Sequence, residues 1–305
     1  MRCAGGGVSA MIRAMQSEMK PFVSRYHDIR DLRIHVREWG RPGAPMLFML
    51  HGWSDISASF QFVVDALRRE WHVIAPDWRG HGRSGRGRDA YWFADYLGDL
   101  DALLQSYSPV EPVRIVGHSM GGNVAQLYAG IRPERVAGLV ALEALGRPDQ
   151  PVEQSPERFA TWLDQLAARG RARGYESVAA FALRLRRANP RLSAERAAFL
   201  ARELSEPDGE GGIRIAIEAA HRHAMPVTHR RAEAEACWRK IRAPVLWLLQ
   251  EGDAWRQSRG LDAAAFEHMK SCFAHLREVR VADCGHNMQH DQPEKLAAEI
   301  ENFFS

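Results

Sequence analysis

The chain has 305 residues, of which 46% are hydrophobic and 26% are charged, and its formal net charge is +3 at neutral pH. This composition is typical of a soluble globular protein with a large core, organised as one big domain or as a core with an insertion. The 41 basic residues are matched by 38 acidic ones and form no basic run with interleaved aromatic residues, so nucleic-acid binding is not expected.

The cysteines and the N-terminal segment indicate the cellular location that is expected for the protein. Cys3, Cys237, Cys272 and Cys284 show neither a C-x-x-C spacing nor the density of a disulfide scaffold, so reduced thiols and a cytoplasmic location are expected. No apolar stretch approaches the length that spans a bilayer, so we expect no membrane insertion. Residues 1–20 lack the continuous apolar segment of a secretory signal and are expected to form a disordered extension.

Predicted strands and helices alternate along most of the chain. Apolar and polar residues alternate from Tyr26 to Trp39, as in one antiparallel strand with a wet face. Apolar runs predict buried strands at 46–50, 71–75, 113–116, 136–142, 243–249 and 276–282, and helical periodicity predicts helices at 60–69, 93–105, 124–131, 261–270 and 293–304. This order predicts an α/β fold with a mostly parallel sheet covered by helices on both faces.

One long segment interrupts this rhythm. Between residues 147 and 240 the strand signal disappears, and Leu, Ala and Arg recur at helical spacings. We therefore expect a helical cap inserted into an α/β core made of residues 21–146 and 241–305. Within the cap, His221, His223 and His229 lack an H-x-x-x-H spacing and a completing set of ligands, so no metal site is expected.

The most informative stretch is V-R-I-V-G-H-S-M-G-G-N-V-A-Q-L-Y-A-G-I at residues 113–131, which has Ser119 near its centre. Its periodicity changes from strand to helix around G-H-S-M-G, as in the G-x-S-x-G nucleophile elbow, where a sharp turn exposes the serine hydroxyl. Glycine suits Gly117 and Gly121 because side chains there would collide across the turn. The structural alternative is a glycine-rich loop that only caps a helix.

These motifs, in this order, resemble the α/β-hydrolase fold family over residues 26–146 and 241–305. The resemblance implies that Ser119 is the nucleophile and that His286, in D-C-G-H-N-M after the last predicted strand, is the general base. A serine hydroxyl is protonated at neutral pH, so an imidazole must take its proton and a carboxylate must hold the imidazole in the correct tautomer. His290 is a second histidine nearby, and a surface position is expected for it.

The triad acid has two candidates. Asp253, in L-L-Q-E-G-D-A-W, occupies the usual position in the family and is preferred. Glu143 ends the predicted strand at 136–142, a position that supplies the acid in some relatives, and either carboxylate is able to reach the same histidine.

The segment His51-Gly52-Trp53 resembles the oxyanion element of the family. The resemblance implies that the backbone N–H groups of Trp53 and Met120 hold the developing oxyanion. His51 is expected to pack beneath this loop and to hold its backbone, not to act as an acid or base.

Together these features predict a serine hydrolase that cleaves a small or medium carboxylic ester through an acyl-enzyme, with a small-molecule acyl substrate, no cofactor and no metal. The elbow G-H-S-M-G-G and the Glu143-Ala-Leu-Gly exit place it nearest the serine hydrolase-like group. Carbon-carbon bond hydrolysis, lactonase, amidase or perhydrolase chemistry on the same triad, and a non-catalytic binding protein, remain alternatives. Dehalogenases and epoxide hydrolases of this fold need a carboxylate nucleophile, which Ser119 does not supply.

Overall fold

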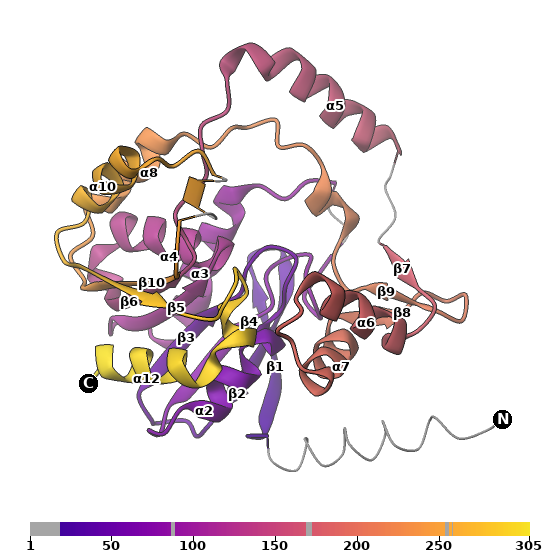
Figure 1. The fold of residues 1–305 in the computed structure, drawn as a ribbon, viewed down its shortest axis with the longest axis horizontal. Helices are drawn as coiled ribbons and strands as arrows, with labels where there is room; N and C mark the ends of the chain where they lie inside the picture. The colour runs from indigo at the N-terminus through magenta and orange to yellow at the C-terminus, as the bar shows by residue number, and fades with distance from the viewer. Residues whose placement is uncertain (1–18, 87–88, 169–172, 254–255, 258) are drawn as a thin grey trace.

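An eight-stranded sheet forms the centre of the protein in the computed structural model (Figure 1). The structure describes residues 19–86, 89–168, 173–253, 256–257 and 259–305, so nearly all of the extension predicted at residues 1–20 lies outside it. The strand order is β1-β2-β4-β3-β5-β6-β10-β11. The strands are β1 (Phe22–Ile29), β2 (Leu32–Trp39), β3 (Met46–Leu50), β4 (His72–Pro76), β5 (Val113–His118), β6 (Val136–Leu142), β10 (Val245–Gln250) and β11 (Leu276–Val281).

The sheet is parallel except at one end. β2 is antiparallel to both β1 and β4, and every later pair from β4 to β11 is parallel, which confirms the predicted α/β class. The single strand predicted from Tyr26 to Trp39 is wrong, because the chain forms a hairpin that turns at Arg30, where φ is +56°. No glycine or proline marks this turn, and the two successive polar residues Arg30 and Asp31 are only a weak turn signal.

Helices cover both faces of the sheet, because successive residues of a strand point to opposite sides. In β3, Phe48 packs into the core beneath one layer of helices and Met49 into the core beneath the other. The first layer holds α3 (Phe93–Tyr107), α4 (Met120–Ile131), α8 (Arg231–Trp238) and α10 (Ala263–Ser271), and the second holds α2 (Gln61–Ala66) and α12 (Pro293–Phe303). Among the described residues, no helix is both long enough and apolar enough to cross a bilayer.

The segment between β6 and β10 differs from its all-helical prediction. It contains α5 (Ser155–Ala168), α6 (Val178–Ala188) and α7 (Ala194–Glu203), but also a small antiparallel sheet of β7 (Gly174–Tyr175), β9 (Ile213–Ile215) and β8 (Ser205–Pro207). α6 and α7 pack against the start of α2 through Phe62, Phe181 and Phe199. α5 stands above the rest of the protein in Figure 1 and buries none of its residues.

The parallel strands determine where the polar motifs meet. Because β3, β5, β6, β10 and β11 run in the same direction, the residues that follow them emerge at one edge of the sheet. His51 follows β3, Ser119 follows β5, Glu143 follows β6, and His286 lies in the loop after β11. Segments far apart in the sequence therefore converge on a single region.

Candidate active site

Ser119 occupies a strained turn between β5 and α4. Its φ of +49° and ψ of −113° are unusual for a residue with a side chain, and its N–H donates to the Leu142 carbonyl at 2.8 Å. A Cβ at Gly121 would lie 2.2 Å from the Leu50 carbonyl oxygen, and one at Gly117 would lie 2.5 Å from the Gly122 Cα. Only glycine fits these two positions, so the turn has the tight geometry predicted for it.

His286 reaches Ser119 from the other half of the chain. Its Nε2 lies 3.0 Å from the Ser119 Oγ, which is hydrogen-bond distance. Its loop is held at both sides, because the His286 carbonyl accepts a hydrogen bond from His118 Nε2 at 2.8 Å and the Gly285 N–H donates to Asp291 at 2.8 Å. The ring therefore approaches the serine from a position fixed by its own backbone.

Glu143 is the carboxylate that the structure brings to His286. Its Oε2 lies 3.7 Å from His286 Nδ1, which is within ion-pair range but longer than a hydrogen bond. The side chain is only 1% exposed, and its Oε1 accepts the Gln250 N–H at 2.6 Å. Glu143 has a positive φ of +50°, so the chain turns sharply as it leaves β6. These contacts hold the carboxylate on the far side of the imidazole from Ser119.

Asp253, the preferred acid, lies elsewhere. Its side chain is 50% exposed and pairs with Arg256 at 2.9 Å and more distantly with Arg280 at 4.0 Å. The hydrogen bond from Arg256 lowers the pKa of this carboxyl below its usual value. Asp253 comes three residues after the end of β10, beyond a turn at Gly252 with φ of +82°, so its chain has already left the sheet edge. Asp253 thus forms its ion pairs with Arg256 and Arg280, whereas Glu143 forms one with His286.

The loop His51-Gly52-Trp53 passes directly over the elbow. A Cβ at Gly52 would lie 2.8 Å from His118 Nδ1 and 3.3 Å from the Ser119 Cβ, so only glycine lets the loop come this close. The Trp53 side chain is 51% exposed, and its indole N–H donates to the His221 carbonyl at 3.2 Å. Met120 is the first residue of α4, directly after Ser119. Both residues predicted to hold an oxyanion therefore belong to segments that adjoin the serine.

His51 supports this loop from below. Its Nδ1–H donates to the Gly52 carbonyl at 2.8 Å, and its Nε2 accepts the Trp78 N–H at 2.9 Å. Burial lowers the pKa of His51 to about 4, so the ring is neutral at physiological pH. These contacts agree with a structural role for His51.

Sequence reasoning missed a buried polar network behind His286. Gln289 Nε2 lies 3.3 Å from Asp55 Oδ2 and donates to His118 Nδ1 at 3.3 Å, and His118 in turn donates to the His286 carbonyl. Burial raises the pKa of Asp55 to about 6 and holds that of His118 well below its usual value. No periodicity or spacing marks this network, because Asp55, His118 and Gln289 come from segments far apart in the sequence.

Two histidines considered from the sequence have structural partners. The surface position expected for His290 is wrong, because its ring is buried and lies 2.5 Å from the Ser59 Oγ, and burial lowers its pKa to about 3. His221 stacks on Tyr91 with ring centroids 3.9 Å apart, and its Nε2 donates to the Arg79 carbonyl at 3.0 Å.

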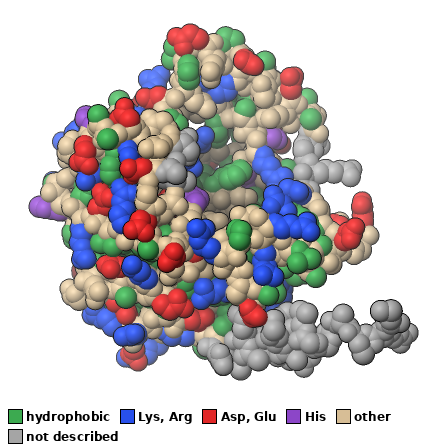
Figure 2. All heavy atoms as spheres, in the orientation of Figure 1, with side chains coloured by type: hydrophobic (Ala, Val, Ile, Leu, Met, Phe, Trp, Pro, Cys, Tyr) green, Lys and Arg blue, Asp and Glu red, His purple; other side chains and the backbone are tan. Residues whose placement is uncertain are grey.

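Space for ligands lies beneath α5 and, separately, among the helices around α4. Figure 2 shows the surface hollowed beneath α5, with hydrophobic side chains inside the hollow and Lys and Arg side chains on its rim. A cavity of about 550 Å³ is bounded by α3, α4 and α8, and its lining residues include Phe93, Leu127 and Val227. Ser119, Glu143 and His286 do not line this cavity, so it lies behind the elbow helix and not at the serine.

Comparison with known proteins identifies the family. The family model described as the alpha/beta hydrolase fold matches residues 45–293. The chain belongs to the α/β-hydrolase fold family. The match includes Ser119, Glu143 and His286, and the sheet described above is the one on which these enzymes are built.

Relatives of this α/β hydrolase include enzymes with different substrates. It is 28% identical to 2-(acetamidomethylene)succinate hydrolase from Mesorhizobium japonicum, over 92% of this chain and 95% of that protein. It is 36% identical to a serine hydrolase-like protein from Danio rerio, but this match covers only 35% of the chain and 33% of the relative. The solved thioesterase domain from the curacin biosynthetic pathway aligns with a TM-score of 0.82 and 26% identity, over 92% of this chain and 99% of that domain.

Proposed function

We propose that this α/β hydrolase is a serine esterase that cleaves small or medium carboxylic esters through an acyl-enzyme. The observation that carries the proposal is the 3.0 Å contact between the Ser119 Oγ and His286 Nε2 at a strained strand-to-helix turn. Glu143, buried 3.7 Å from the other ring nitrogen, is proposed as the acid in place of Asp253. A carboxylate at this position favours the tautomer that leaves Nε2 free to accept the serine proton.

The proposed reaction has two halves. In the first, the Ser119 Oγ attacks the ester carbonyl while His286 Nε2 takes the hydroxyl proton, and the N–H groups of Trp53 and Met120 stabilise the oxyanion. The intermediate then collapses, and His286 gives the proton to the departing alcohol. In the second half, His286 deprotonates a water that attacks the acyl-enzyme, and the carboxylic acid leaves as the serine hydroxyl is restored.

The segment between β6 and β10 is proposed to act as a lid over the bound ester. Its support is the hydrogen bond from the Trp53 indole to the His221 carbonyl, which joins this segment to the loop above the serine. The hollow beneath α5 supplies the space in which an acyl chain is expected to bind.

Ser119→Ala tests the mechanism directly. We expect the variant to lose at least about 10⁴-fold in kcat on a short-chain aryl ester, because removal of the nucleophile in a serine triad has effects of this size or larger. Labelling by a fluorophosphonate should disappear with it. Ser106→Ala, which removes an exposed hydroxyl bonded only to the Leu103 carbonyl, is the matched control and should keep both properties. Full activity in Ser119→Ala, or no labelling of the wild-type protein, would exclude the mechanism.

A second candidate is hydrolysis of an amide-bearing dicarboxylate. It is supported by the likeness to 2-(acetamidomethylene)succinate hydrolase, which extends over 92% of this chain. The same nucleophile and base serve either bond, so the substrate pocket alone decides between them. Comparing kcat/KM for aryl esters of increasing acyl length with that for 2-(acetamidomethylene)succinate separates the two, and we expect the esters to be preferred.

A further inference from the structure

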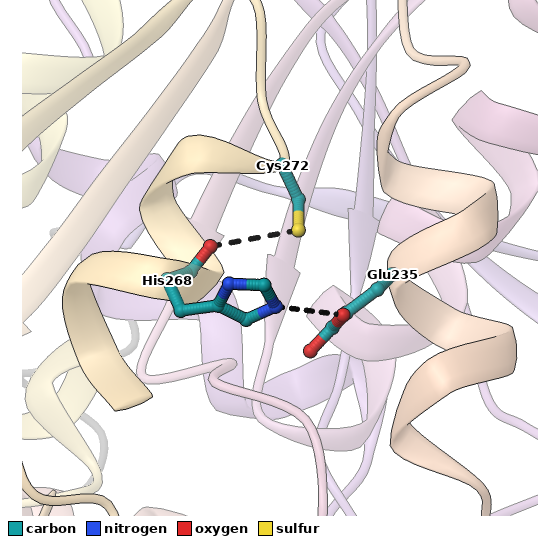
Figure 3. Close-up of side chains that lie close together, drawn as sticks. All are labelled: Glu235, His268 and Cys272. Atoms are coloured by element: carbon teal, nitrogen blue, oxygen red, sulfur yellow. Dashed lines mark hydrogen bonds and ion pairs between the residues drawn. The ribbon is translucent and has the colours of Figure 1, made fainter. Parts of the chain in front are cut away.

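Three side chains that bind metals in other proteins meet between α8 and α10, away from the serine (Figure 3). They are Glu235 of α8, His268 of α10 and Cys272 at the end of α10, and their ligand atoms all lie within 4.8 Å of one another. His268 and Cys272 are four residues apart, so one turn of helix places them on the same face. Glu235 reaches them from the neighbouring helix, with its Oε2 3.0 Å from His268 Nε2.

We propose that Glu235, His268 and Cys272 bind a divalent transition-metal ion such as Zn²⁺. Imidazole nitrogen, thiolate sulfur and carboxylate oxygen are the donors that zinc prefers, and water completes a tetrahedral site with three protein ligands. In a tetrahedron with bonds of about 2.0 Å, two ligand atoms are about 3.3 Å apart. The 3.0 Å between the His268 and Glu235 atoms is already close to this spacing, and the Cys272 sulfur lies within 4.8 Å of both atoms.

The surroundings give the site access and orientation. The His268 side chain is 58% exposed, so an ion reaches the site from solvent and keeps a water ligand, whereas Cys272 is 2% exposed and fixed by packing. Arg239 donates to Glu235 Oε2 at 3.0 Å and orients the carboxylate. Its positive charge also opposes a bound cation, so we expect weaker binding than at a structural zinc site with four protein ligands.

A bound ion would connect two helices of the layer that contains the elbow helix α4. α8 lies directly against α4, since a Cβ at Gly130 of α4 would be 2.0 Å from the Cys237 carbonyl oxygen. α10 and α8 share the same hydrophobic core, and Phe273, just past the end of α10, stacks on Trp238 of α8 with ring centroids 5.4 Å apart. The ion would therefore hold the packing behind α4 without contacting the serine, and this inference does not depend on the proposed esterase activity.

Cobalt titration of the purified full-length chain tests the site. After treatment with a chelator, Co²⁺ should produce the near-ultraviolet charge-transfer absorption of a cobalt-thiolate bond, and Zn²⁺ should compete with it and raise the Tm. We expect Cys272→Ser to lose the absorption and His268→Asn to weaken zinc binding at least about tenfold, because loss of even an indirect metal contact has effects of this size. Cys237→Ser, on α8 but outside the cluster, is the control and should behave as wild type.

Several outcomes overturn the proposal. These are the absence of the cobalt-thiolate absorption in the wild-type protein, its survival in Cys272→Ser, or its loss in Cys237→Ser. If Cys272→Ser does not fold, the exposed His268→Asn carries the test, and a zinc-induced rise in Tm that is unchanged in this variant excludes the site.

Discussion

The two candidate acids allow a sharp comparison, because Glu143→Gln and Asp253→Asn each remove one carboxylate charge with little change in shape. Glu143→Gln keeps the oxygen that accepts the Gln250 N–H, so the loop after β6 should retain its conformation. What it removes is the charge 3.7 Å from His286 Nδ1, which is needed when His286 becomes an imidazolium in the transition state.

The expected loss follows from this distance. At an effective dielectric constant of about 20, two unit charges 3.7 Å apart attract each other by about 4.5 kcal/mol. At 1.36 kcal/mol for each tenfold change, this corresponds to about 2,000-fold in kcat. The His286 side chain is 32% exposed, and solvent screening reduces the figure, so we expect a loss of about 1,000-fold. Asp253→Asn breaks only exposed ion pairs with Arg256 and Arg280 and should change kcat less than about threefold.

The assay is steady-state hydrolysis of a short-chain aryl ester at pH 8, with thermal unfolding of each variant to confirm that it is folded. A large loss in Asp253→Asn with near-normal turnover in Glu143→Gln would refute the assignment of Glu143. Equal losses in both variants would show that charge near the sheet edge, and not contact with His286, controls the rate.

Two further predictions concern stability. Burial raises the folded-state pKa of Asp55 to about 6, so the unfolded chain releases this proton first as pH rises from about 4. The wild-type free energy of unfolding should therefore fall over this range by up to about 3 kcal/mol relative to that of Asp55→Asn, and it should level off above pH 6. Urea unfolding at each pH measures this difference, and a pH-independent difference would contradict it. Gly121→Ala should lower the Tm by several degrees or prevent folding, because its Cβ would meet the Leu50 carbonyl oxygen at 2.2 Å. Gly43 has a φ of +94° and nothing within 4 Å of a Cβ, so Gly43→Ala should lower the free energy of unfolding by only about 1–2 kcal/mol.

Local patterns were enough to predict most of the core, and two of the predicted site residues, Ser119 and His286, lie within hydrogen-bond distance of each other. The apolar runs marked β3, β5, β6 and β10 because these strands are buried on both faces. Ser119 was predicted because the elbow is a local motif, and His286 was predicted because the resemblance to the α/β-hydrolase family implies a histidine after the last strand.

The triad acid and the short strands between β6 and β10 could not be predicted, because they depend on the paths that loops take in space. Asp253 and Glu143 follow adjacent parallel strands, and a turn at Gly252 lies between β10 and Asp253. The number of residues between each carboxylate and the end of its strand was the signal that distinguishes the two candidates. Glu143 comes directly after β6, whereas Asp253 lies three residues beyond β10. The strands β7, β8 and β9 are only two or three residues long, too short for any periodicity to reveal.

Because α5 is exposed, it should unfold locally more easily than the central sheet. A helix of 14 residues is marginal in water unless it packs, and α5 buries none of its residues. Phe159 and Leu163 are 46% and 57% exposed, and a ring contact between Trp162 and Trp92 joins the helix to the start of α3. In hydrogen exchange, the amides of α5 should therefore exchange long before those of β5, and a protease should cut here first. Slower exchange in α5 when an ester analogue is bound would identify this helix as the part of the protein that closes on its ligand.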